Sequence, residues 1–230
     1  MAVFMYGRSE PPAFFKEMLS DNTWEEIATA CQLNKVPDTW AIGDSKPMTV
    51  NGVTYQIDII GKNHDTYSDG TGTAPLTFQF RDCFATKYSM NISEHNDGGW
   101  LESDMRLTNF PIIYNLLPAE VKRNIRLVNK KSSTGHQRTV ISTAQDTLFL
   151  LSEVEVYGDT PFSVSGEGTQ YAYYANGGST VKKVNNTASI WWQRSPYRGN
   201  PTSFCAAQAA GRYNYESAHE AYGVSPAFCF

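Results

Sequence analysis

The chain has 230 residues, of which 41% are hydrophobic and 18% charged, and its formal net charge is −4. A chain of this length and composition can bury the core of one large globular domain and is too apolar for a disordered protein. The acidic balance excludes the broad basic surface that nucleic-acid binding requires, so no nucleic-acid partner is expected.

No apolar run reaches the ~20 residues that a membrane-spanning helix needs, so membrane insertion is not expected. The N-terminus lacks a basic stretch followed by an apolar core, which is the pattern of a signal peptide. We therefore expect synthesis in the cytoplasm without a signal peptide, and any export would need another route.

The first 39 residues are expected to form a helical segment that precedes the main domain, residues 40–230. Residues 11–32 have a helical pattern, with apolar side chains at i, i+3 and i+4 spacing: Phe14, Phe15, Met18 and Leu19. Thr23 followed by Glu26 is a capping box, which predicts a second helix from Trp24 to Cys31.

From Trp40 the hydrophobic period becomes that of strands. Asn51-Gly52, between the apolar segments 48–50 and 53–55, predicts a hairpin with a two-residue turn. Residues 76–80 alternate between apolar and polar side chains, which predicts another strand.

Two polar loops carry oxygen atoms of the kind that calcium prefers. One contains Asn63, His64, Asp65 and Asp69, and the other spans 94–97, but neither has the spacing of an EF-hand. We interpret them as turn residues that hydrogen-bond their own backbone, and we expect no metal ion and no cofactor.

A helical stretch is predicted over about 101–127, interrupted at Pro111 and Pro118. We interpret the basic residues in and after it as a solvated helix face and helix end: Lys122, Arg123, Arg126, Lys130 and Lys131. Residues 129–145 are expected to form a polar loop, and residues 148–154 a buried strand.

Three short strands are expected near the C-terminus, over 189–194, 204–209 and 223–230. On a strand, Trp191 and Trp192 would point to opposite sides, so only one of them can face a given core. Four apolar side chains are expected to build the core around that tryptophan: Phe204, Val224, Phe228 and Phe230.

No two of the cysteines have the C-x-x-C spacing of a zinc ribbon or a redox motif: Cys31, Cys83, Cys205 and Cys229. We interpret them as buried small hydrophobic residues. A bridge between Cys205 and Cys229 on neighbouring strands stays open at this point.

Short motifs follow one another in a fixed order: Trp40-x-x-Gly43-Asp44, Ile59-Ile60-Gly61-x-Asn63-His64-Asp65, Gly99-Trp100-x-x-Ser103-Asp104-Met105-Arg106, Leu150-Leu151-Ser152-Glu153-Val154-Glu155, Trp191-Trp192-x-Arg194-Ser195-Pro196 and Tyr222-Gly223-Val224-x-Pro226-Ala227-Phe228-Cys229. In this order they resemble an uncharacterised family of gut bacteria and their prophages, over about Trp24 to Phe230.

The last two motifs also resemble C-type-lectin-like proteins of the formylglycine-generating-enzyme type, a group that includes the variable proteins of diversity-generating retroelements. Relatives often carry arginine in the closing motif, where this chain has Ser225. The resemblance implies an α+β fold: a C-type-lectin-like domain with short antiparallel strands, two or more helices and long loops.

Between these two motifs, the segment from Tyr197 to Tyr222 has the composition of a paratope. Tyrosine supplies large contact area at low entropic cost, and Asn, Ser and Gly supply adaptable hydrogen bonds. The candidate ligand-binding residues are Tyr197, Arg198, Asn200, Gln208, Arg212, Tyr213, Asn214, Tyr215, Glu216, His219, Glu220 and Tyr222.

These observations favour a recognition module that binds a host-cell surface protein or glycan from a phage tail or a bacterial surface. By analogy with phage fibres it would be a homo-oligomer, for example a trimer. One alternative is a structural phage component that packs through the same segment. Another is a formylglycine-generating-type oxidase, which Cys205 and Cys229 match in residue type only. Ser195 lies in no nucleophile elbow, and the protein is not expected to be an enzyme.

Overall fold

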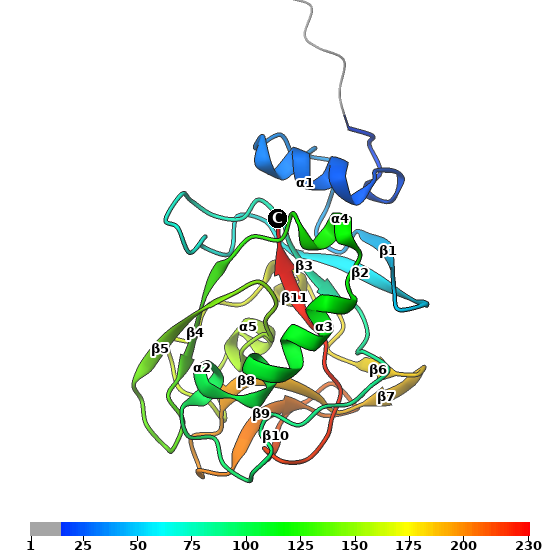
Figure 1. Cartoon of the computed structure of the whole chain (residues 1–230). Coiled ribbons are helices and arrows are strands. Elements are labelled where there is room, and N and C mark those ends of the chain that lie inside the picture. The colour runs from blue at the N-terminus through cyan, green and yellow to red at the C-terminus, as the bar shows by residue number, and fades with distance from the viewer. Residues whose placement is uncertain (1–14) are drawn as a thin grey trace, which may run out of the picture.

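An antiparallel sheet joins three strands from the first 80 residues to the last strand of the chain in the computed structural model, which describes residues 15–230 (Figure 1). Its strand order is β1-β2-β3-β11. The bounds are β1 (Ser45–Val50), β2 (Val53–Gly61), β3 (Thr77–Phe80) and β11 (Ala227–Cys229). Around it lie further short antiparallel sheets and a few short helices, so the fold is of mixed α/β type.

The capping box at the start of α1 (Trp24–Gln32) is confirmed. The Thr23 hydroxyl accepts a hydrogen bond from the Glu26 amide at 3.1 Å, and the Glu26 carboxylate accepts one from the Thr23 amide at 2.7 Å. The ring of Trp24 packs edge-on against Phe78 at 5.6 Å between centroids, and also against Phe228 and Phe230. Helix α1 therefore shares its core with the sheet, and the domain boundary at residue 39 stays a prediction.

The helix expected before α1 is absent from the described residues, where only a short 3₁₀ turn, Leu19–Asp21, forms. The buried side chain of Asn22 bonds the Lys16 amide and carbonyl and the Met18 carbonyl. A side chain that satisfies nearby backbone groups competes with the helix for them. The part of this expected helix at residues 11–14 lies outside the described residues.

The hairpin at Asn51-Gly52 is confirmed, with β1 and β2 in register from Val50↔Val53 onward. Both turn residues have positive φ, 48° and 80°, as a type I′ turn requires.

We expect Gly52→Ala to lower the free energy of unfolding by about 1 kcal/mol, because an L side chain is strained at that φ. Chemical denaturation measures this loss. Asn51→Gly, which keeps positive φ accessible, should cost less, and equal losses for the two variants would contradict this assignment of the turn.

The predicted helical stretch is confirmed as far as Lys122, in pieces: α2 (Gly99–Glu102), a π-helix (Met105–Asn109), α3 (Phe110–Leu116) and α4 (Ala119–Lys122). Its expected last part, residues 123–127, is not helical. Pro118 precedes α4, where the chain was expected to break. Pro111, in the first turn of α3, does not interrupt the stretch, since the π-helix runs directly into α3.

Two predictions for the middle of the chain are wrong. Residues 129–145 are not a loop: β4 (Val128–Ser133) and β5 (Ile141–Asp146) form a hairpin whose inward side chains include the polar Lys130 and Ser132. Residues 148–151 are buried, but they form no strand beyond one bridge from Phe149 to Ala227. Helix α5 (Glu153–Tyr157) then begins at a capping box made by Ser152 and Glu155.

A second sheet, of order β10-β9-β8, carries the candidate site. Its strands are β8 (Trp191–Pro196), β9 (Ser203–Ala207) and β10 (Tyr213–Ser217). The sequence predicted β8 and β9 but not β10, and the strand expected over 223–230 shortens to β11. The remaining elements are α6 (Ala172–Ala175), β6 (Lys182–Val184) and β7 (Thr187–Ser189).

Candidate binding site

The scaffold of the site is β8, which is buried on both sides. Trp191 and Trp192 are each 0% exposed, and both belong to the same core cluster. Their indole N–H groups donate to the carbonyls of Thr180 at 2.9 Å and Tyr88 at 2.8 Å. The expectation that only one tryptophan faces a given core is therefore wrong, because the chain folds around both sides of this strand. The four expected core residues are all buried: Phe204, Val224, Phe228 and Phe230.

None of the candidate ligand-binding residues is buried. Seven are exposed: Arg198, Gln208, Arg212, Tyr213, Tyr215, His219 and Glu220. Five are half-buried: Tyr197, Asn200, Asn214, Glu216 and Tyr222. They do not form one face, however, because alternate residues of β10 point to opposite sides of its sheet.

On one side of the sheet, four aromatic rings gather into a surface that we call the Tyr face: Phe162, Tyr197, Tyr213 and Tyr215. Tyr197 stacks on Tyr215 with centroids 3.9 Å apart and planes 10° apart. Phe162 meets the three tyrosines edge-on at 5.1–5.6 Å. Tyr213 remains 50% exposed and Tyr215 37%. These rings are held in place by one another and still face solvent.

The other side of β10 is more polar. The Glu216 carboxylate accepts hydrogen bonds from the Asn214 amide at 2.7 Å and from the Tyr222 hydroxyl at 3.0 Å. Burial and the Glu216 carboxylate together raise the pKa of Tyr222 to about 12. The ring of Tyr222 packs edge-on against Trp192. Tyr222 and Glu216 are therefore tied to the scaffold, unlike Tyr213.

Asn96 holds the turn between β8 and β9 that carries Tyr197 and Arg198. Its buried side-chain amide donates to the carbonyls of Tyr197, Asn200 and Ser203, and its side-chain oxygen accepts from the His136 amide. Sequence reasoning missed this residue, which appeared only as part of a polar loop.

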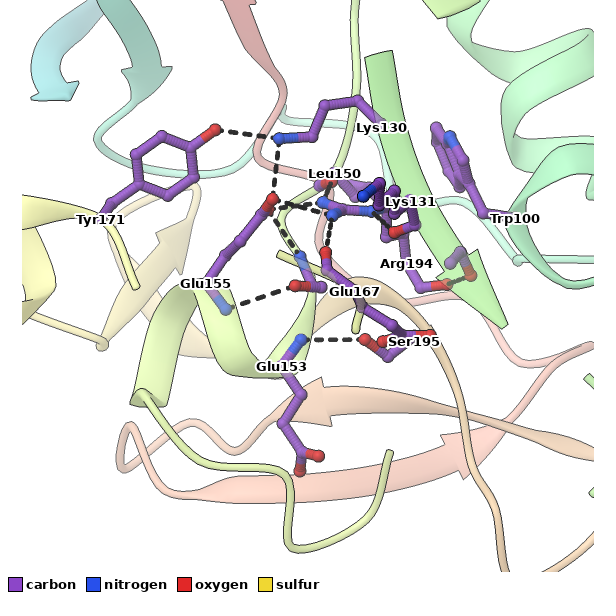
Figure 2. A network of polar contacts seen from close by, with 12 residues as sticks. Trp100, Lys130, Lys131, Leu150, Glu153, Glu155, Glu167, Tyr171, Arg194 and Ser195 are labelled. Carbon is purple, nitrogen blue, oxygen red and sulfur yellow. Dashed lines mark hydrogen bonds and ion pairs between the residues drawn. The ribbon is translucent and has the colours of Figure 1, made fainter. Parts of the chain in front are cut away.

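Beneath the site, Arg194 of β8 is 0% exposed and holds several segments together (Figure 2). It donates to both carboxylate oxygens of Glu155, with 2.8 Å to Oε1. It also donates to three backbone carbonyls, those of Lys131, Leu150 and Glu167. A buried guanidinium with this many partners fixes β8 relative to β4 and α5.

Lys130, which was expected on a solvated surface, is a buried member of the same network. Its ammonium group lies 2.7 Å from Glu155 and also donates to the Tyr171 hydroxyl (Figure 2). It lies 2.7 Å from Asp65 as well. Although burial acts to raise the pKa of Asp65, Lys130 and further hydrogen bonds lower it to about 2. The loop containing Asp65 is thus not a simple polar turn, whereas Asp69 does bond the nearby Thr71 backbone as expected.

A comparison with models of protein families matches Domain of unknown function (DUF6273) over residues 76–230, more than half of the chain. The chain belongs to this family. The DUF6273 match contains Arg194, Glu155, Lys130 and all the candidate ligand-binding residues, whereas Asp65 and the β1–β2 hairpin precede it. Comparisons with curated proteins and with solved structures give no match.

Within the DUF6273 region, Glu167 is buried beside the arginine network. One oxygen accepts from the Ser133 amide at 2.7 Å, whereas the other has no hydrogen-bond partner of normal geometry. Burial raises the pKa of Glu167 to about 7. A pocket of about 620 Å³ opens nearby, with Lys130, Asp65 and Glu155 among its lining residues. Because these three groups satisfy one another, they provide no unpaired charge for a ligand.

The cysteines of the described chain are free and buried. Burial raises the pKa of both the Cys205 and Cys229 thiols well above the ordinary value. Neither thiol is therefore activated as a thiolate in this structure, and the bridge between them does not form.

Within residues 15–230, no group of three or more His, Cys, Asp or Glu side chains is arranged to hold a metal ion. None of the helices in this part of the chain has the length and apolar character needed to cross a membrane.

Proposed function

We propose that this DUF6273 protein is a recognition module that binds a host-cell surface protein or glycan through its Tyr face. One observation carries the proposal: Tyr213 and Tyr215 stand 50% and 37% exposed on a sheet whose next strand, β9, is wholly buried. A solvent-facing aromatic cluster on a rigid scaffold is the usual arrangement of a binding surface.

The packing of the Tyr face favours tight binding. Phe162 braces Tyr213 and Tyr215, and Tyr197 stacks on Tyr215, so these rings lose little freedom when a partner arrives. Interfaces are enriched in tyrosine and arginine at the positions that contribute most to affinity. Arg198 and Arg212 are exposed just before β9 and β10, respectively.

A C-type-lectin-like fold is part of the same proposal. Support comes from the tryptophan-rich strand β8 and from β11, which closes a sheet that N-terminal strands begin. The location on a phage tail or bacterial surface is proposed from the family resemblance, and the homo-oligomeric state is proposed by analogy with phage fibres. The Tyr face would also suit packing against a neighbouring phage component.

The test is binding of the fluorescently labelled chain to a panel of intact bacterial cells and to a glycan array. We expect the double variant Tyr213→Ala, Tyr215→Ala to lose at least about 100-fold in affinity, because it removes the two most exposed rings of the Tyr face. Its melting temperature should change by only a few degrees, since both side chains are already solvent-exposed.

Leu33→Ala with Val140→Ala is the matched control, because it truncates two exposed apolar side chains elsewhere on the surface. It should bind like the wild type. Equal binding by the tyrosine variant, or no binding by the wild type to any cell or glycan, would count against recognition. Self-association that disappears in the tyrosine variant would favour the structural role instead.

A further inference from the structure

The outer strand of the second sheet, β10, has one free edge. It pairs with β9 and with no other strand of the described chain, and Figure 1 shows it at the bottom of the view, beyond β8 and β9. A free edge presents backbone groups that another chain can pair with.

Backbone bonds at both ends of β10 determine which residues face outward. Gln208 donates its amide to the Arg212 carbonyl at one end, and Ala218 donates to Thr202 at the other. The register with β9 between them has no shift. Because bonding alternates along an antiparallel pair, three residues direct their amides away from β9: Tyr213, Tyr215 and Ser217.

This edge lacks several of the usual protections against strand pairing. Its one charged residue, Glu216, points to the side away from the Tyr face, where it bonds Asn214 and Tyr222. Natural sheets guard their edges with lysine, proline or a bulge, and the sequence of β10, Tyr-Asn-Tyr-Glu-Ser, contains neither lysine nor proline. Its register with β9 shows no bulge. The residues with outward amides also place their side chains on the Tyr face, so one added segment would meet both the free backbone and the aromatic rings.

Two exposed arginines beside β10 favour an acidic partner. Arg198 lies in the turn before β9, where its amide donates to the carbonyl of Phe162 on the Tyr face. Arg212 directly precedes β10, on the side of the sheet opposite Tyr213. In the part of the chain from 15 to 230, neither guanidinium forms an ion pair with a carboxylate. Arginine is well suited to bind carboxylates in two-pronged geometry.

We propose that an extended, acidic segment of a protein partner adds to β10 as a fourth strand of this sheet. The inference rests on the proposed function and identifies the partner as a protein. Main-chain hydrogen bonds to Tyr213, Tyr215 and Ser217 supply affinity, and alternate side chains of the segment contact the tyrosine rings. Carboxylates of the segment pair with Arg198 and Arg212.

The test separates backbone pairing from side-chain contact at Ser217. Ser217→Pro removes an outward amide and leaves the aromatic rings in place, and proline is tolerated on an edge strand where its N–H would face solvent. Ser217→Ala is the matched control, since it also loses the hydroxyl contact to Glu94 but keeps the amide. The probes are linear peptides enriched from a random phage-displayed library panned on the wild-type chain.

We expect the enriched peptides to be acidic and to bind Ser217→Ala within about twofold of wild type. Ser217→Pro should weaken them at least about tenfold, the effect of losing one or more main-chain hydrogen bonds. Arg198→Ala with Arg212→Ala should weaken them further and reduce the salt dependence of binding. In the wild type, hydrogen exchange at the amides of Tyr213, Tyr215 and Ser217 should slow when peptide binds.

Failure to enrich peptides, or peptides that bind Ser217→Pro as well as Ser217→Ala without slowing these amides, would overturn strand addition. If cell or glycan binding is then lost only in the Tyr213→Ala, Tyr215→Ala variant, the Tyr face is a recognition surface of another kind, such as one that holds a glycan. If that variant also binds normally, the proposed function fails as well.

Discussion

Arg194→Met is expected to lower the free energy of unfolding by about 3–5 kcal/mol, the usual cost of removing one partner from a buried ion pair. The substitution leaves the Glu155 carboxylate with Lys130 as its only charged partner. It also removes hydrogen bonds to three backbone carbonyls. Those to Leu150 and Glu167 are buried, and that to Lys131 is partly buried. Methionine fills part of the volume, so the loss reflects polar partners rather than a cavity.

Chemical denaturation of Arg194→Met and of a surface control measures this effect. The control is Arg126→Met, because Arg126 pairs with Asp69 while both side chains are well exposed. Exposed pairs contribute ~0–1 kcal/mol, so the control should stay close to wild type. Similar losses for the two variants would show that the buried network does not hold β8 in place.

Glu167→Gln is expected to make stability less dependent on pH and to stabilise the fold in mildly alkaline solution. The pKa of Glu167 rises from an ordinary 4.5 to about 7 because the carboxyl group is buried. Between these values the folded state holds more protons than the unfolded state, so stability falls as pH rises. Below pH 4.5 both states are protonated and the penalty is absent; above pH 7 it is fully present.

At pH 8 the glutamine variant should therefore be more stable than wild type by on the order of 2–3 kcal/mol, and at pH 4 the two should be alike. Glutamine keeps an oxygen that can accept from the Ser133 amide. Melting temperatures of wild type and Glu167→Gln, measured from pH 4 to pH 8, test this expectation. Glu17→Gln, at an exposed position, serves as the control, and a stability difference that is constant with pH would contradict the buried-carboxyl account.

Local signals in the sequence were sufficient for some elements. Thr23 and Glu26 marked the start of α1, and Asn51-Gly52 marked the β1–β2 turn, because capping boxes and type I′ turns are stabilised by the residues that form them. The same signal was present at Ser152 and Glu155, but the apolar run before it suggested that a strand continued there.

Other elements depend on partners far along the chain. The β4–β5 hairpin was not predicted because its inward residues include Lys130, which can be buried only because Asp65 and Glu155 lie opposite it. Hydrophobic periodicity does not reveal a strand whose inward side chains are polar. Within the basic cluster, Lys130 was misread for the same reason, whereas Lys122 and Arg123 do lie at the C-terminal end of α4.

The candidate site was partly visible in the sequence. The paratope-like composition correctly indicated that the candidate ligand-binding residues between Tyr197 and Tyr222 are at least partly solvent-accessible, although β9 between them is buried. The division of the candidate residues between the two sides of the sheet was not predicted, because no signal in the sequence indicated that residues 213–217 form strand β10. Phe162, which braces the Tyr face, comes from a loop distant in sequence and carried no signal of its own.

The most direct test of the account is a displayed library in which Arg198, Arg212, Tyr213 and Tyr215 are randomised together, sorted once for protease resistance and once for binding to a cell or glycan that the wild type recognises. If a buried scaffold carries a separate recognition surface, most members should resist protease as well as the wild type, while very few should retain its binding. A library in which most members are cleaved would show that these side chains hold the fold together, and retained binding in most members would show that the partner is contacted elsewhere.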